Sequence, residues 1–414
     1  MERQVFVYVD LAGQPVLVGR LWTRVRRGQE SATFEYDRQW LAHPSCYSLE
    51  PALALGPGPH HTAPGRALFG ALGDSAPDRW GRVLMRRSER RRAELEKRQP
   101  RTLNEIDFLM MVDDEARMGA LRFSESDGGL LLAGGLPAAA MRIPPLIELP
   151  RLLAASERVV SEKDTDEDIR LLLAPGSSLG GARPKAAVRE RDGSLAIAKF
   201  PQKTDEMRTV LWEALALELA AKAGVRVPGW RLETVAKKPV LVLRRFDRGV
   251  DAAVRIPFLS AMSMLGAADH DTGHSYLEIA DAIRQHGAEP KEDLRQLWRR
   301  IVFNVAISNT DDHLRNHAFI YEGNRGWRLS PAYDLNPVPV EFKPRILSTL
   351  IDADDGTASV ELALSVAGYF LVSPAEGRKI AAEVGRAVKQ WRKGAARLGL
   401  RATEVDRMAS AFEH

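Results

Sequence analysis

The sequence contains only one cysteine, Cys46, among its 414 residues. A single thiol excludes an internal disulfide and a zinc site built from several cysteines, which fits a reducing compartment. The sequence also lacks an apolar run near the roughly 20 residues that a membrane-spanning helix needs. Its first residues, Met1-Glu-Arg-Gln4, show no signal-peptide pattern. We therefore expect a cytoplasmic protein without a membrane partner.

The chain also has little net charge, +4 at pH 7, which does not by itself indicate a nucleic-acid-binding protein. Its composition, 45% hydrophobic and 28% charged, is typical of a folded globular protein. A chain of 414 residues exceeds a single-core domain, so we expect two or three domains or lobes.

The first part of the chain predicts a small antiparallel sheet followed by helices. Alternating apolar and polar residues indicate strands at 4–10, 15–22 and 32–37. Ser75-Ala-Pro-Asp78 is typical of a helix start, and the helix continues into an arginine-rich run whose interleaved glutamates favour a solvated surface. A second helix is expected at 104–111 and a strand at 118–123. Residues 124–148, rich in Gly, Ala and Pro, form the clearest candidate boundary.

The order of elements after residue 176 is more informative. Ser177 to Lys185 is a small-residue loop that ends in a cation. The pattern then predicts, in order, strands at 186–190 and 195–200, a helix at 206–223, and strands at 230–235 and 239–244. The remainder is mostly helical, with helices expected at 274–286, 291–308, 374–393 and 402–413.

A polar cluster between two apolar runs, residues 307–317, is the strongest candidate site. Asp311 is followed five residues later by Asn316, and Asp334 comes 18 residues after that. Protein-kinase-like enzymes place a catalytic base and two metal ligands in this order. Asp311 would accept or orient the proton of an attacking hydroxyl, while Asn316 and Asp334 would supply oxygen ligands for Mg²⁺. A capped helix end is the plainer interpretation of the same residues.

Other members of this cluster have open roles. Asp312 is an alternative to Asp311, but only Asp311 has an asparagine five residues later. His313 lies where it could donate to a phosphate oxygen. For His317 we favour a hydrogen bond that stabilises the loop, because the spacing does not suit a histidine metal site.

Upstream residues supply the cations that a phosphoryl donor needs. The Ser/Gly loop matches neither the protein-kinase glycine loop nor a Walker A sequence, and alone it is weak evidence. Lys199 late in a strand, followed by Glu213 on the next helix, is the layout of the kinase Lys–Glu ion pair. Glu218 competes with Glu213, which we prefer because it lies nearer the helix start.

Several motifs resemble the HipA family of toxin kinases, and together they span nearly the whole chain. The most specific is Asn309-Thr-Asp-Asp-His-Leu-Arg-Asn316. The others are Ser178-Leu-Gly-Gly-Ala-Arg-Pro-Lys-Ala186, Ala198-Lys-Phe200, Arg245-Phe-Asp-Arg248, Pro331-Ala-Tyr-Asp-Leu335, and two N-terminal motifs at 69–82 and 118–123.

The resemblance implies an α+β, two-lobed protein-kinase-like fold with an extra N-terminal β-rich subdomain and a mostly helical C-terminal lobe. The expected segments are 1–125, 126–248 and 249–414. It further implies an ATP- and Mg²⁺-dependent serine/threonine-protein kinase, silenced by autophosphorylation at Ser178. By the same resemblance, the nucleotide-binding residues are Ser178, Gly180, Gly181, Ala182, Arg183, Lys185, Lys199, Arg244, Phe246, His313 and Tyr333.

The resemblance also implies partners: a small helix-turn-helix antitoxin like HipB, DNA only through that antitoxin, and a protein substrate such as an aminoacyl-tRNA synthetase. Arg244 departs from the acidic residue common at its position, which leaves its adenine contact open. A small-molecule phosphotransferase and a catalytically silent antitoxin-binding pseudokinase are alternatives. The basic charge balance argues against the first, and the presence of Lys199, Asp311, Asn316 and Asp334 argues against the second.

Overall fold

The computed structural model describes residues 2–129, 131, 143–176, 181–249, 254–269 and 271–414. The backbone divides into two compact units. The first unit comprises Met1–Lys203 and Glu233–Leu259, and the second comprises Thr204–Leu232 and Ser260–His414. Each unit is described on its own below.

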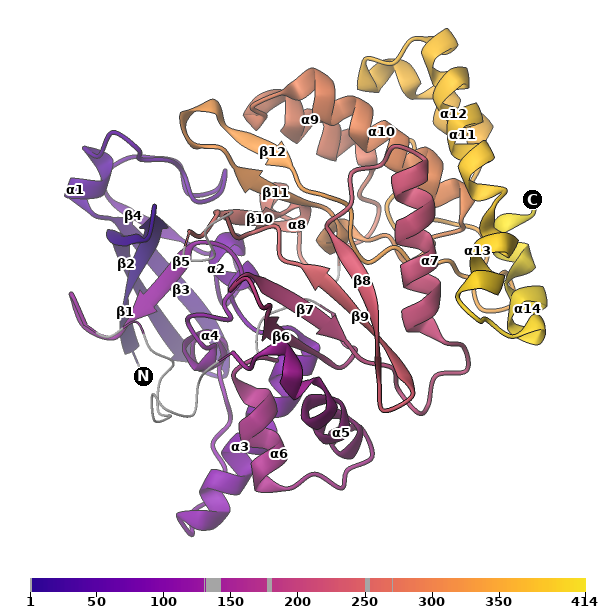
Figure 1. Cartoon of the computed structure of the whole chain (residues 1–414). Helices are drawn as coiled ribbons and strands as arrows, with labels where there is room; N and C mark the ends of the chain where they lie inside the picture. Colours follow the sequence, from indigo (N-terminus) through magenta and orange to yellow (C-terminus); the bar gives the residue numbers. More distant parts are fainter. Residues whose placement is uncertain (1, 130, 132–142, 177–180, 250–253, 270) are drawn as a thin grey trace. The chain divides into compact units, whose positions relative to one another are not determined.

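The first unit begins with an antiparallel sheet, as the alternating pattern predicts (Figure 1). Its strands lie in the order β4-β3-β2-β1-β5. The late strand β5 pairs with β1, so the chain returns to the N-terminal sheet after four helices. The strand bounds are β1 Glu2–Leu11, β2 Gln14–Arg26, β3 Gln29–Tyr36, β4 Pro59–His61 and β5 Leu121–Ser124.

One helix of this unit, α3 (Arg79–Leu95), begins later than the sequence predicted. Its N-cap is Asp78, whose side chain accepts from Gly81 N, while Ser75 instead ends the short helix α2. Of the i,i+4 pairs that the interleaved charges predict, Arg92 and Glu96 form one at 2.8 Å, whereas Arg91 contacts Asp164, which lies outside the helix. The other helices are α1 Arg38–Leu41, α2 Gly70–Asp74, α4 Glu105–Met111, η2 Leu146–Glu148, α5 Leu149–Val160 and α6 Asp166–Leu173.

A second sheet follows, with the strand order β6-β7-β9-β8. Its bounds are β6 Lys185–Arg189, β7 Leu195–Lys199, β8 Trp230–Val235 and β9 Lys238–Arg244, close to the predicted strands. Small apolar side chains on one face, including Ala186, Ala196 and Ala198, pack with residues of α3, α5 and α6 in one buried cluster. Burial of this face fixes the register, because a one-residue slip would turn every side chain to the other face.

The second unit is mostly helical, as expected. Helix α10 lies at its centre: Leu297, Trp298 and Ile301 are fully buried, and the Trp298 indole donates to Ala363 O at 2.9 Å. The predicted helix 374–393 is divided at Lys389 and Gln390 into α12 and α13. The bounds are α7 Thr209–Lys222, α8 Ala261–Met264, α9 Tyr276–His286, α10 Pro290–Ala306, α11 Val360–Ser365, α12 Pro374–Val388, α13 Trp391–Arg397 and α14 Ala402–Phe412, with η3 Leu314–Asn316, η4 Gly323–Arg325 and η5 Ala367–Phe370.

Three short strands complete the fold, in the order β10-β11-β12. Their bounds are β10 Phe258–Ser260, β11 Ala318–Tyr321 and β12 Trp327–Leu329. Strand β11 directly follows the predicted site, so the polar residues stand between buried helix α10 and a strand. Within the described ranges, the helices are too short or too polar for any of them to traverse a bilayer.

Candidate active site

The polar stretch 307–317 leaves helix α10 through a tight turn at Ser308. This buried residue has a φ of 50°, a left-handed conformation of the kind common where helices end. Its hydroxyl donates to Ala411 O at 3.0 Å and accepts from Arg345 Nε at 3.0 Å. The turn is therefore held by two other segments of the second unit, and the residues after it start from a defined position.

Asp312 is the buried centre of the stretch, with a side chain that is 2% exposed. Its Oδ2 accepts from Asn304 Nδ2 at 2.8 Å and from His317 Nε2 at 2.7 Å. The Tyr276 hydroxyl donates to the same oxygen, and burial together with the Asp312 charge raises the pKa of Tyr276 well above its ordinary value. Because a carboxylate only accepts, all three groups act as donors. Asp312 thus joins α9, α10 and the loop, and it does not face solvent.

Asp311, by contrast, turns its carboxylate outward, and its side chain is 61% exposed. Its backbone is fixed, because its carbonyl accepts from Asn316 Nδ2 at 3.1 Å and from His313 N at 2.9 Å. An exposed carboxylate on a fixed backbone suits a group that accepts a proton from an incoming hydroxyl. Of the two adjacent aspartates, the geometry favours Asp311 for chemistry and Asp312 for structure.

Lys343 is a candidate functional residue that the sequence did not reveal. Its Nζ lies 2.9 Å from Asp311 Oδ1, and its side chain is 51% exposed. A cation beside the candidate base can also approach a phosphate. Nothing marks Lys343 in the sequence, because the contact joins residues 32 positions apart in a segment without regular secondary structure.

The two predicted metal ligands present hard oxygen atoms. The Asn316 amide nitrogen donates to the Asp311 carbonyl, which orients the amide group and leaves its oxygen as the atom that could hold a metal ion. Asp334 is half-buried and has a φ of 58°, a conformation that costs energy for a residue other than glycine and often marks a functional position. Asn336 Nδ2 donates to Asp334 O at 3.1 Å and to Oδ1 at 3.3 Å. One carboxylate and one amide oxygen fit Mg²⁺, which takes few protein ligands beside phosphate and water.

The remaining predicted residues of the second unit take different positions. His313 is exposed, whereas His317 is buried against Asp312, as its expected loop-stabilising role requires. The Tyr333 hydroxyl donates to Arg315 O at 2.7 Å, so it braces the loop that carries Asn316. In the described part of the chain, His, Cys, Asp and Glu side chains nowhere gather in the groups of three or more that a metal centre made from them would need.

The two candidate glutamates on α7 differ in their surroundings. Glu218 is engaged at the surface by Arg397 and lies 2.8 Å from Lys222. Glu213 is buried, 4% exposed, in the second turn of the helix. A carboxylate is seldom buried on an apolar helix face unless it has a specific structural or functional role, whereas ion pairs at the surface are common. The contrast favours Glu213 over Glu218.

In the first unit, two of the predicted lysines lie opposite each other. The antiparallel register pairs Lys185 of β6 with Lys199 of β7. Directly opposed side chains on one face of a sheet have Cβ atoms about 5 Å apart. Lys185 is buried beside Asp78, and Lys199 is half-buried. Gly181 and Ala182 are exposed and Arg183 is half-buried, whereas Ser178 and Gly180 lie outside the described residues.

The predicted hinge segment is anchored by buried charges. Arg244 is exposed and Phe246 half-buried. Arg245, which lies between these two residues in the sequence, contacts the Asp247 carboxylate at 2.6 Å. Arg248, which follows them, contacts the same carboxylate at 2.7 Å. These two cations hold the pKa of the buried Asp247 far below its ordinary value against the opposing effect of burial. The segment that carries Phe246 is therefore anchored on both sides of that residue by buried ion pairs.

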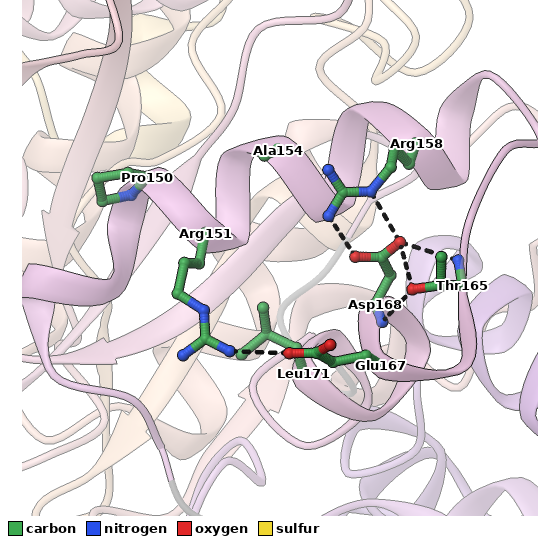
Figure 2. Close-up of a pocket in the computed structure, with 8 residues that line it drawn as sticks. All are labelled: Pro150, Arg151, Ala154, Arg158, Thr165, Glu167, Asp168 and Leu171. Atoms are coloured by element: carbon green, nitrogen blue, oxygen red, sulfur yellow. Dashed lines mark hydrogen bonds and ion pairs between the residues drawn. The ribbon is translucent and has the colours of Figure 1, made fainter.

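A cavity of about 500 Å³ lies between α5 and α6 (Figure 2). Its charged groups satisfy one another: Arg158 Nε lies 2.8 Å from Asp168 Oδ2, and Arg151 Nη2 lies 3.1 Å from Glu167 Oε1. None of the predicted site residues lines it. The lining residues are Pro150, Arg151, Ala154, Arg158, Thr165, Glu167, Asp168 and Leu171.

Known sequences match parts of this chain. A Sinorhizobium fredii protein named as a candidate kinase, Y4mE, is 28% identical over 181 residues, which are 38% of this chain and 41% of that protein. A Haemophilus influenzae protein, also named as a candidate kinase, is 32% identical over 213 residues, or 45% of this chain and 61% of its own. The matched stretches thus cover less than two thirds of either relative.

The fold has a solved counterpart. A chain in the complex of HipA, HipB and operator DNA from Shewanella oneidensis MR-1 matches with a TM-score of 0.66 at 16% identity. The match covers 98% of this chain and 94% of that one, and it confirms the predicted fold class. The family model described as the HipA-like C-terminal domain matches residues 177–391, more than half of the sequence. The chain therefore belongs to the family of proteins with a HipA-like C-terminal domain.

Proposed function

We propose that this protein is a cytoplasmic ATP- and Mg²⁺-dependent serine/threonine-protein kinase that acts as the toxin of a toxin–antitoxin pair. The observation that carries the proposal is the pair of adjacent aspartates. Asp312 is buried under three donors, while Asp311 is held by its backbone and presents an exposed carboxylate. A loop that only ended a helix would not need this division. The family and the kinase-named relatives support the same reading.

In the proposed reaction, Asp311 accepts the proton of the substrate hydroxyl while that oxygen forms a bond to the γ-phosphorus of ATP. The bond from the γ-phosphorus to the β,γ-bridging oxygen breaks, and ADP leaves. Lys185 and Lys199 offset the phosphate charge. Asn316 and Asp334 would hold Mg²⁺, which neutralises charge on the phosphates when bound.

The remaining predicted residues have supporting roles in the proposal. Glu213 takes the carboxylate role of the kinase Lys–Glu pair. Arg244 and Phe246 contact the adenine, and His313 donates to a phosphate oxygen. Tyr333 supports the Asn316 loop through its bond to Arg315 O, in addition to the nucleotide contact that the family resemblance implies.

The solved structure supports the proposed antitoxin partner. That structure contains HipA with HipB and operator DNA. We propose that this chain likewise binds a small HipB-like helix-turn-helix antitoxin and reaches DNA through it. The substrate is a protein, and an aminoacyl-tRNA synthetase is the first candidate to assay.

Phosphotransfer to a protein acceptor, measured with the purified full chain and ATP-Mg²⁺, tests the proposal. Asp311→Asn should lower the rate by about 100- to 10,000-fold, the range typical of general-base removal. The matched control is Asp406→Asn, because Asp406 is also exposed and likewise has one cationic side chain nearby, that of Arg392 at 3.5 Å. Wild-type activity in Asp311→Asn would refute the assignment, and equal loss in the control would remove its specificity.

A further inference from the structure

Lys185 is a buried lysine whose partner comes from a distant part of the chain. Its Nζ lies 3.3 Å from Asp78 Oδ2, and the two side chains are 3% and 6% exposed. The residues are 107 positions apart. A buried ammonium group is stable only beside an opposite charge or strong acceptors. Asp78 is therefore part of the reason that Lys185 can occupy this place.

Asp78 is itself held by the helix that it begins. It is the N-cap of α3, and its Oδ1 accepts from Gly81 N at 2.6 Å. With one carboxylate oxygen committed to the helix, the other has a defined direction toward Lys185. Burial raises the pKa of the Asp78 carboxyl, and the Lys185 charge opposes that rise.

The first turns of α3 also hold the backbone on both sides of the small-residue segment. On the later side, the Trp80 indole donates to Lys185 O at 3.0 Å. On the earlier side, a Cβ added to Gly176 would lie 2.8 Å from Leu84 Cδ1 and 3.1 Å from Trp80 Nε1. The tightest contact of such a Cβ would be with Leu172 O at 2.7 Å, a backbone atom, so glycine fits here without displacing its neighbours. Helix α3 is thus a common support for Gly176 and Lys185.

The ammonium group of Lys185 lies close to the backbone of Gly181. A Cβ added to Gly181, which has a φ of +82°, would lie 3.1 Å from Lys185 Nζ. The strand register also sets Lys185 opposite Lys199. Like charges opposed on a ladder repel, and a polyphosphate near both would offset that repulsion.

We propose that Asp78 is a positioning residue for the nucleotide phosphates: through its ion pair it fixes Lys185 beside Gly181, so the N-terminal part of the chain completes the phosphate site. The proposal rests on the proposed kinase function. Asp78 does not touch the nucleotide. Its effect comes from restricting a long, flexible side chain before the phosphates arrive, which removes an ordering cost from binding.

The variant Asp78→Asn separates this role from helix capping. Asparagine caps helices as well as aspartate does, so the bond to Gly81 N is retained, while the charge facing Lys185 is lost. We expect the affinity for ATP, measured by calorimetry on the full chain, to fall about tenfold, which corresponds to about 1.4 kcal/mol. In a protein that already carries Lys185→Gln, Asp78→Asn should cause no further loss of ATP affinity. The control is Asp37→Asn, because Asp37 caps α1 through Gln39 N.

A second measurement does not depend on activity. An amine-acylating reagent, with mass spectrometry of the Lys185 peptide, should label Lys185 several-fold faster in Asp78→Asn than in the wild type. Unchanged ATP affinity in Asp78→Asn, or an equal loss with and without Lys185, would overturn the proposal. If Asp78→Asn does not fold, Lys185→Gln is compared with the double variant Asp78→Asn/Lys185→Gln, which replaces the ion pair by two neutral amides. A lower ATP affinity in the double variant than in Lys185→Gln also overturns the proposal.

The two failures remain distinguishable. If the wild-type chain binds no ATP, the kinase function is wrong. The labelling comparison still decides whether Asp78 holds Lys185: faster labelling supports the ion pair, and equal labelling overturns it.

Discussion

Two adjacent aspartates should respond in opposite ways to the same substitution. Asp311→Asn is expected to lower the rate of phosphotransfer strongly with little effect on stability, whereas the main effect of Asp312→Asn should be a loss of stability. The reason is their exposure: the Asp311 side chain is 61% exposed and the Asp312 side chain is 2% exposed. The residues are neighbours and the chemical change is identical, so each variant is the control for the other.

The magnitude for Asp312 follows from its three donors. The Tyr276 hydroxyl, Asn304 Nδ2 and His317 Nε2 all donate to Oδ2. A hydrogen bond to a charged group contributes about 1.5–3 kcal/mol, and a neutral one contributes about 1 kcal/mol. Losing roughly 1 kcal/mol at each of three bonds predicts a free energy of unfolding lower by about 3 kcal/mol. Alanine should cost more, because it leaves the three buried donors without their acceptor.

The magnitude for Asp311 is small. Its side chain has one ion pair, with Lys343, and both groups are more than half exposed. Solvent screens such pairs, which contribute between zero and about 1 kcal/mol. Its fixed backbone bonds, from Asn316 and His313, do not involve the carboxylate and survive the change.

Urea unfolding followed by tryptophan fluorescence measures the stability difference, because Trp298 lies fully buried on α10. Phosphotransfer is measured on the same preparations below the unfolding transition. Wild-type stability in Asp312→Asn would refute the assignment of Asp312 as the structural centre. A loss above about 2 kcal/mol in Asp311→Asn would exceed what an exposed pair supplies and would refute the division between the two residues.

Three further outcomes are expected. Burial raises the pKa of Glu50 to about 7 from 4.5, so the folded protein keeps a proton that the unfolded chain loses, and stability should fall as pH rises from 4.5 to 7. Glu50→Gln should remove this pH dependence of stability and raise stability at pH 8 by at most about 3 kcal/mol. An unchanged pH dependence in the variant would contradict the role of Glu50. Asp334→Asn should keep stability, since asparagine tolerates a positive φ, yet lose Mg²⁺-dependent ATP affinity; equal affinity across a Mg²⁺ titration would count against the metal role. Ser178 should gain phosphate on incubation with ATP, as measured by intact mass and peptide mapping. An unphosphorylated Ser178 under conditions in which the substrate is phosphorylated would refute self-silencing by autophosphorylation.

Local patterns in the sequence were enough to predict the elements around Lys199. The predicted order of strand, strand, helix, strand and strand corresponds to β6, β7, α7, β8 and β9. Each has its own periodicity and turn residues within a few positions. The start of α3 was placed too early for a related reason: both Ser75 and Asp78 can cap a helix, and only packing shows that Ser75 ends α2.

The partners within the site could not be predicted in this way. Spacing identified Asp311 and Asn316, but Tyr276 lies 36 residues from Asp312 and Lys343 lies 32 residues from Asp311. Such contacts depend on how helices and loops pack, and a single sequence carries no local signal for them. The buried role of Asp312 therefore emerged only from the structure.

Contacts between residues distant in the sequence also show where the functional part of the chain begins. The family match starts at residue 177, yet groups that precede residue 177 contact buried charged side chains that follow it. Asp78 pairs with Lys185, and Gly119 N donates to the Asp247 carboxylate at 2.7 Å. Arg245 further donates to backbone carbonyls in the same early segment, at 2.7 and 2.9 Å. A chain cut at residue 177 would leave these buried charged groups without several of their partners, a strongly destabilising change. The N-terminal part is therefore a structural requirement of the segments that carry Lys185 and Asp247, not an appendage to them.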